Sequence, residues 1–137
     1  MNHQRPISLY IVMRGADKER LRPVVRLLLT MAMRTLIGVE LKFENGRPLM
    51  PHKHRLLMML DEFPSLGRMQ LVEGALPKCA GYGIKAFLAA QDREQMFQAY
   101  GQHQSITANC HIRIIYAPNE WTTGKWVSEM AGRSSVI

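Results

Sequence analysis

The sequence predicts an α/β protein with a mainly parallel sheet flanked by helices. Residues 56–60 are consecutive apolar residues without polar alternation, a pattern typical of a strand that is buried on both faces. A second run, residues 84–90, is apolar apart from Lys85, and apolar residues at helical spacing lie between the two runs. Together these elements have the length of one βαβ unit, in which the crossover is right-handed and the strands are parallel.

Two further elements are expected before this unit. Ile7–Met13 is rich in β-branched and aromatic residues and predicts a buried strand. From Asp17 to about Val39 the apolar residues follow helical spacing, so we expect an amphipathic helix. Pro23 lies inside this pattern and must either start the regular helix or kink it, because proline has no backbone N–H. Another face carries three arginines, which we expect to be solvated rather than bound to DNA: Arg22, Arg26 and Arg34.

The segment Glu44–Arg55 contains Asn45-Gly46 and two prolines without apolar periodicity, and it predicts a loop. His52 and His54 occupy alternate positions in it, which raises the question of a zinc site. No neighbouring cysteine or acid completes a ligand set, so a basic surface loop is the preferred interpretation.

The remainder of the chain alternates between helix and strand. We expect helices at Arg68–Ala80, at about Asp92–Tyr100 and at about Glu120–Ala131. Asp92 is well placed to cap the second of these helices. His111–Ala117 consists mostly of branched and aromatic residues and predicts another strand.

The composition is that of a soluble globular protein. Of the 137 residues, 47% are apolar and 21% are charged, which excludes a disordered chain. The net charge of +7 favours polyanionic partners such as nucleic acid or phosphate. Cys79 and Cys110 belong to no CxxC pair, so we expect a reduced protein without a disulfide. No stretch approaches the roughly 20 apolar residues of a membrane span.

Candidate site residues follow both strands of the βαβ unit. Asp61 and Glu62 come directly after the first strand, and Gln91 follows the second. Parallel strands end at the same edge of a sheet, where open α/β folds bind their ligands. An acid in this position can bind Mg²⁺, its neighbour can accept the proton of an attacking water, and the amide can orient that water. The alternatives are a merely solvated strand end and a glutamine that satisfies a helix end.

Several longer motifs carry a resemblance to a known family. They are ADKERLRP (16–23), HRLLMMLDEFPSLGRM (54–69), AGYGIKAFLAAQD (80–92), AYGQHQSI (99–106), NCHIRIIYAPNE (109–120) and SEMAGRSSV (128–136). In this order and spacing they resemble the nucleotide-hydrolase domain of the TraG-type coupling proteins of conjugation and type IV secretion, which are RecA-like motor ATPases.

The resemblance implies a partial RecA-like P-loop NTPase domain with ATP and Mg²⁺ as cofactors. It makes Asp61 the Mg²⁺ ligand, Glu62 the catalytic base and Gln91 the sensor residue of the third nucleotide-binding motif. In such motors ATP lies between the subunits of a ring, often a hexamer. The motor delivers single-stranded DNA in a relaxase complex to the type IV secretion channel, from the cytoplasmic face of the bacterial inner membrane.

The chain departs from this family pattern in two ways. It contains no GxxxxGK[ST] phosphate-binding loop, which the family places upstream together with a membrane anchor. We therefore expect residues 1–137 to be a C-terminal portion of the hydrolase domain that is inactive alone. Some relatives also carry an arginine shortly before the sensor strand, where Lys78–Gly83 reads KCAGYG. Arg93 and Arg133 are possible substitutes for it.

Two other functions are open to a chain of this composition. A non-catalytic fragment without ATPase activity of its own would bind DNA or a partner protein through its basic surface. A metal nuclease built on Asp61 and Glu62 is a weaker alternative, because the sequence places no further acids around them.

Overall fold

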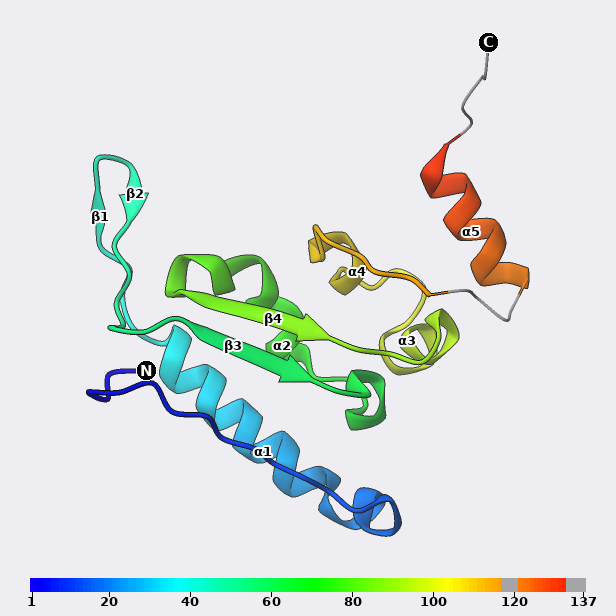
Figure 1. Cartoon of the computed structure of the whole chain (residues 1–137), viewed down its shortest axis with the longest axis horizontal. Coiled ribbons are helices and arrows are strands. Elements are labelled where there is room, and N and C mark those ends of the chain that lie inside the picture. The colour runs from blue at the N-terminus through cyan, green and yellow to red at the C-terminus, as the bar shows by residue number, and fades with distance from the viewer. Residues whose placement is uncertain (117–120, 133–137) are drawn as a thin grey trace.

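The computed structural model describes residues 1–116 and 121–132 (Figure 1). Its helices and strands are α1 (Lys18–Ile37), β1 (Phe43–Glu44), β2 (Arg47–Pro48), β3 (Leu56–Leu60), α2 (Gln70–Ala75), β4 (Ile84–Leu88), α3 (Arg93–Tyr100), α4 (Ile106–Asn109) and α5 (Trp121–Ala131). Short 3₁₀ turns cover Gly15–Asp17, Phe63–Leu66 and Leu76–Tyr82. No helix in these ranges is both long enough and apolar enough to cross a membrane.

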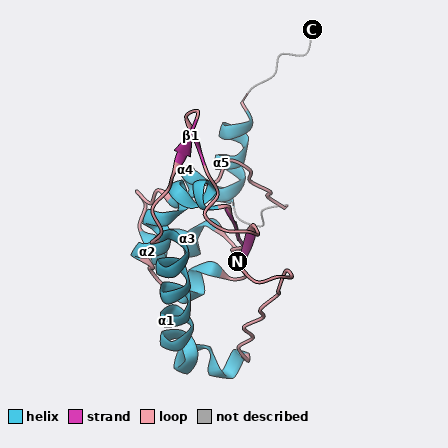
Figure 2. Ribbon diagram, turned by 90° about the vertical axis from the view of Figure 1, so that its left-hand side faces the viewer, coloured by secondary structure: helices cyan, strands magenta, loops and turns pink. Residues whose placement is uncertain are grey.

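The predicted βαβ unit is confirmed. Strands β3 and β4 are parallel, and their register runs from Leu56 opposite Ile84 to Leu60 opposite Leu88. Helix α2 and the following 3₁₀ turn connect them, and α2 contacts α1 (Figure 1). Figure 2 shows these helices on one side of the sheet. The chain is therefore α/β, as the sequence predicts.

Strand β3 is buried on one face only, so the expectation of burial on both faces is wrong. Met58 and Leu60 are 8% and 9% exposed and belong to the same buried cluster as Val25 of α1. Leu57 and Met59 point the other way and are 60% and 61% exposed. Side chains alternate along a strand, and within the described residues the helices cover only one of the two faces.

Helix α1 matches the predicted helix and runs through Pro23 without ending there. The expectation that its arginines are merely solvated is wrong for Arg26. Its Nη1 donates a hydrogen bond to the Leu66 carbonyl oxygen at 2.6 Å, and its Nη2 donates to that of Arg68 at 2.9 Å. Gly67 lies between these carbonyls with φ of 69°, and a Cβ there would come within 3.1 Å of Arg26 Nη1. Arg26 thus fixes α1 to the turn that follows β3.

Two predicted strands are absent from the described chain. Ile7–Met13 is an irregular segment (Figure 2). Its side chains are mostly exposed. Residues 111–116 also form no strand, and Ile112 is 84% exposed. A strand needs hydrogen bonds from a neighbouring strand, and neither segment has one among the described residues. Ala117, the predicted end of the second strand, and Glu120, the predicted start of the last helix, lie outside the described residues.

The segment Glu44–Arg55, predicted to be a loop, contains all but the first residue of a small hairpin, in which β1 pairs with β2 across the turn Asn45-Gly46. Both turn residues have positive φ, which suits the Asn-Gly pair. His52 is buried and its Nε2 lies 2.9 Å from the Leu36 carbonyl oxygen, whereas His54 Nε2 lies 2.9 Å from that of His3. The prediction that His52 belongs to a basic surface loop is therefore wrong, because its ring is buried at the carboxyl end of α1.

The other helices largely follow the prediction. Asp92 Oδ1 accepts a hydrogen bond from the Gln95 backbone N–H at 2.7 Å, which confirms the predicted cap of α3. The predicted helix Arg68–Ala80 is α-helical only over α2 and continues as the 3₁₀ turn Leu76–Tyr82. Pro77 lies at the start of that turn, where its missing N–H breaks the α-helical hydrogen-bond pattern.

Candidate functional site

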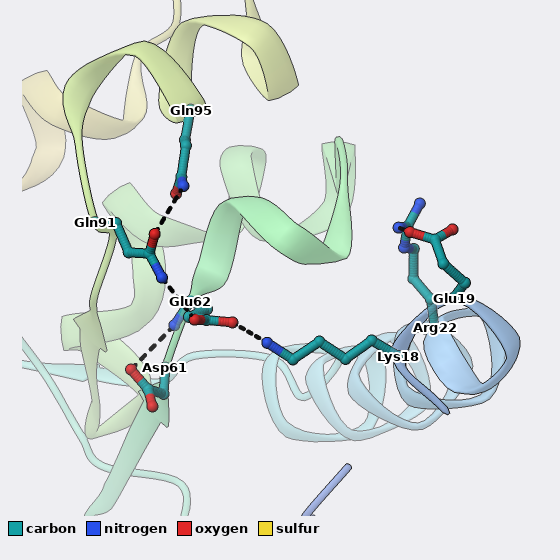
Figure 3. A network of polar contacts seen from close by, with 7 residues as sticks. All are labelled: Lys18, Glu19, Arg22, Asp61, Glu62, Gln91 and Gln95. Atoms are coloured by element: carbon teal, nitrogen blue, oxygen red, sulfur yellow. Dashed lines mark hydrogen bonds and ion pairs between the residues drawn. The ribbon is translucent and has the colours of Figure 1, made fainter. Parts of the chain in front are cut away.

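The structure brings Asp61, Glu62 and Gln91 together at the carboxyl edge of the parallel strands, as predicted. Gln91 Nε2 donates a hydrogen bond to Glu62 Oε1 at 2.8 Å (Figure 3). The Glu62 backbone N–H donates to Asp61 Oδ1 at 3.1 Å. These residues lie close together because of the register of β3 and β4: Leu60 is paired with Leu88, so both strands end at the same edge of the sheet.

The backbone at Glu62 is held in an unusual conformation. Its φ of 48° and ψ of 44° are left-handed, which costs a residue other than glycine about 1–2 kcal/mol. Hydrogen bonds on both sides hold the turn: Ala89 N–H donates to the Leu60 carbonyl at 3.0 Å, and Phe63 N–H donates to that of Ala89 at 2.9 Å. Backbone strain of this kind clusters at functional sites, and here it falls on the residue whose side chain accepts the bond from Gln91.

Lys18 is a member of the site that the sequence analysis does not identify. Its Nζ forms an ion pair with Glu62 Oε2, from the first residue of α1 (Figure 3). The hydrogen bond and the positive charge of Lys18 hold the pKa of the Glu62 carboxyl below its usual range, and the Gln91 bond adds to this effect. Desolvation of the carboxyl acts in the opposite direction and raises its pKa. Nothing in the sequence links two residues that are 44 positions apart.

Substitution of Lys18 by Met is expected to raise the pKa of Glu62 towards its ordinary value of 4.5. A lowered pKa in the folded state stabilises the fold above the pKa of the unfolded chain, and this contribution disappears as the pH falls through the folded pKa. The variant should therefore lose less stability in acid than the wild type. A ¹³C NMR titration of the Glu62 carboxyl measures the change.

Arg20→Met is the matched control, because Arg20 pairs with Asp17 at 2.9 Å and not with Glu62. It should leave the titration of Glu62 unchanged. An unchanged pKa in Lys18→Met would show that the ion pair does not persist in solution.

A groove of about 350 Å³ opens beside Glu62 and Gln91. The groove is lined mostly by polar side chains from α1 and α3 and by the turn after β3. Its lining residues are Arg22, Glu62, Pro64, Ser65, Gly67, Gln91, Gln95, Gln98 and Ala99. Arg22 also pairs with Glu19 one turn earlier in α1. A guanidinium, three amides and a carboxylate around one groove suit a ligand that carries anionic groups, such as a phosphate.

The acids of the site fit Mg²⁺ better than zinc. Carboxylate oxygens are the ligands that Mg²⁺ prefers, and it commonly binds through one or two of them while keeping several waters. Asp61 is exposed, and its Oδ2 has no hydrogen-bond partner in the described part of the chain. The described residues contain no group of three or more His, Cys, Asp or Glu side chains that could hold a metal ion by themselves.

Of the two possible substitutes for the missing arginine, Arg93 and Arg133, the structure describes only Arg93. The Arg93 guanidinium lies over two aromatic rings, 4.4 Å from the centre of Phe97 and 4.8 Å from that of Trp126. In this position it joins α3 to α5 by cation–π contacts. Arg133 lies outside the described residues.

Comparison with known proteins places the chain in a family. The family described as "Type IV secretory system Conjugative DNA transfer" matches residues 2–136. Two proteins of Escherichia coli named "Conjugal transfer protein TraG" are 46% identical over 140 residues, covering 100% of this chain and 22% of their own length. "Protein VirD4" of Rhizobium radiobacter is 25% identical over 131 residues, covering 94% of this chain and 18% of its own.

No solved structure matches the chain. The chain spans about a fifth of the length of the curated relatives it matches. The resemblance to TraG-type coupling proteins is confirmed by the family match and by these identities. The chain belongs to the type IV secretory system conjugative DNA transfer family.

Proposed function

We propose that this chain is the C-terminal part of a RecA-like ATPase domain in a coupling protein, and that it supplies the hydrolytic half of the ATP site. The observation that carries this proposal is the hydrogen bond from Gln91 to Glu62 at the ends of two parallel strands. An acidic pair and a neutral amide in this arrangement suit hydrolysis of a nucleoside triphosphate. Membership of a conjugative DNA transfer family supports the same reading.

Each residue has a separate role in this proposal. Asp61 binds Mg²⁺, directly or through its water shell. Glu62 accepts the proton of the attacking water, and Gln91 orients that water by donating or accepting a hydrogen bond. ATP supplies the phosphoryl group, and Mg²⁺ neutralises charge on its phosphates. Lys18 holds the pKa of Glu62 down in the described state, so Glu62 would become a stronger base if Lys18 released it.

Other parts of the complete protein would finish this site. The phosphate-binding loop is not among these 137 residues. The exposed face of the sheet carries Leu57, Met59 and Phe87, and further elements of a RecA-like domain would cover it. The assembled motor would be a ring, often a hexamer in the family pattern, and we propose that ATP binds between its subunits. The motor would drive relaxase-bound single-stranded DNA into a type IV secretion channel at the bacterial inner membrane.

Substitution of Asp61 by Asn in the complete protein tests the proposal. We expect the Mg²⁺ concentration for half-maximal ATP turnover to rise at least about tenfold, because the neutral amide is a weaker ligand. Asp17→Asn is the matched control, since Asp17 pairs with Arg20 outside the groove. ATP turnover that is absent in the wild type, or an unchanged Mg²⁺ requirement in Asp61→Asn, would contradict the proposal.

The second candidate is a basic fragment that binds DNA or a partner without hydrolysing ATP. The net charge of +7 favours it. Its DNA affinity would fall steeply with salt and would be independent of ATP and of Asp61. A salt titration with and without ATP separates this candidate from the first.

A further inference from the structure

The orientation of the Gln91 side-chain amide matters for the proposed site. One end of this amide donates hydrogen bonds and the other accepts them. With Nε2 towards Glu62, the amide donates to the carboxylate at 2.8 Å. If the amide were turned over, its oxygen would face the negatively charged Glu62 oxygen, and the two would repel each other.

Gln95 contacts the other end of this amide. Its Nε2 donates a hydrogen bond to Gln91 Oε1 at 3.3 Å (Figure 3). Gln95 lies in the first turn of α3, where its backbone N–H donates to the capping Asp92 at 2.7 Å. It is half-buried and lines the groove beside Glu62. The cap therefore fixes the backbone of a side chain that reaches back to the end of β4.

We propose that Gln95 is a positioning residue that holds the Gln91 amide with its donor end towards Glu62. A donor from Gln95 requires an acceptor from Gln91, and this leaves only the Gln91 N–H group for the carboxylate. With Gln95 Nε2 where the structure places it, a turned-over Gln91 amide would put two NH₂ groups together on one side and two oxygens together on the other. This role rests on the proposed function, because it assigns a fixed orientation to the residue that positions the attacking water.

Gln95→Glu in the complete protein tests the proposal. The new side chain has the same length, but its carboxylate only accepts hydrogen bonds and so attracts Gln91 Nε2 away from Glu62. An acid in the first turn of a helix is favourable, so α3 should remain folded. We expect kcat for ATP hydrolysis to fall about 10- to 100-fold, as for other supporting residues, with KM for ATP within about twofold of the wild type.

Three further variants separate positioning from a structural role. Gln95→Lys still donates to Gln91 Oε1 and should retain most of the wild-type kcat. Gln95→Ala removes the bond without reversing it and should give an intermediate kcat. Gln102→Glu makes the same chemical change at an exposed position that does not line the groove, and it should match the wild type.

The outcomes distinguish this role from the proposed function. A wild-type kcat in Gln95→Glu, or a kcat in Gln95→Lys as low as in Gln95→Glu, would overturn the role of Gln95 while leaving ATP hydrolysis in place. A wild-type protein without ATP turnover would overturn both. A low kcat in Gln95→Glu, an intermediate kcat in Gln95→Ala and a kcat close to the wild type in Gln95→Lys would support the proposal.

Discussion

Glu62→Gln in the complete protein is expected to lower ATP turnover by at least about 10²-fold, the usual contribution of a general base. The amide cannot accept the proton of the attacking water. The amide of the variant has the same shape as the Glu62 carboxylate. Its oxygen can still accept the hydrogen bond from Gln91, which is 2.8 Å long in the structure. The left-handed backbone at residue 62 is unaffected, so the groove should keep its form. Nucleotide should therefore bind and remain unhydrolysed.

The measurement is steady-state ATP turnover together with nucleotide binding at equilibrium. Glu94→Gln is the matched control, because Glu94 is exposed in the first turn of α3 and is not part of the groove. It should behave as the wild type does. Turnover at the wild-type rate in Glu62→Gln would remove Glu62 from the reaction, and loss of nucleotide binding would assign it a binding role instead.

Phe63→Ala is expected to lower the free energy of unfolding of the 137-residue chain by about 3–5 kcal/mol. Phe63 has no exposed surface and stacks on Tyr100, with ring centres 5.2 Å apart and planes at 23°. It directly follows Glu62, and its backbone is bonded to Ala89. The truncation leaves a cavity between the turn after β3 and helix α3, directly beneath the candidate site.

Denaturant unfolding measures this loss, and the titration of Tyr100 gives a second reading. Burial raises the pKa of Tyr100 to about 12, and water entering the cavity should lower it towards 10. Phe43→Ala is the control: Phe43 is 65% exposed in the β1–β2 hairpin, so its truncation should change stability by less than about 0.5 kcal/mol. Similar losses in the two variants would show that Phe63 is not a core residue of the chain in solution.

The sequence predicts the centre of this fold well because local signals agree there. The apolar runs at β3 and β4, the intervening helix and the Asp92 cap each specify one element. Their spacing then requires the carboxyl ends of both strands to meet, which places Glu62 beside Gln91. The prediction is wrong at Ile7–Met13 because strand propensity describes one chain segment, whereas a strand exists only when a second segment pairs with it.

Contacts between distant segments could not be predicted in the same way. Lys18 lies at the start of α1, and helical periodicity says nothing about which carboxylate its side chain reaches. The Arg26 bonds to the turn after β3 and the left-handed conformation of Glu62 depend on how α1 packs against that turn. Gln95 could have been found from its spacing, because a residue four positions after Gln91 and three after a capping Asp92 lies in the first turn of α3.

The most direct test of the account is a structure of the complete protein with a non-hydrolysable ATP analogue and Mg²⁺. We predict that the terminal phosphate lies at the carboxyl edge of β3 and β4. A water beside that phosphate should lie within hydrogen-bonding distance of Glu62 and Gln91, with Lys18 no longer paired to Glu62. A nucleotide bound away from this edge, with the Lys18–Glu62 ion pair intact, would contradict the account.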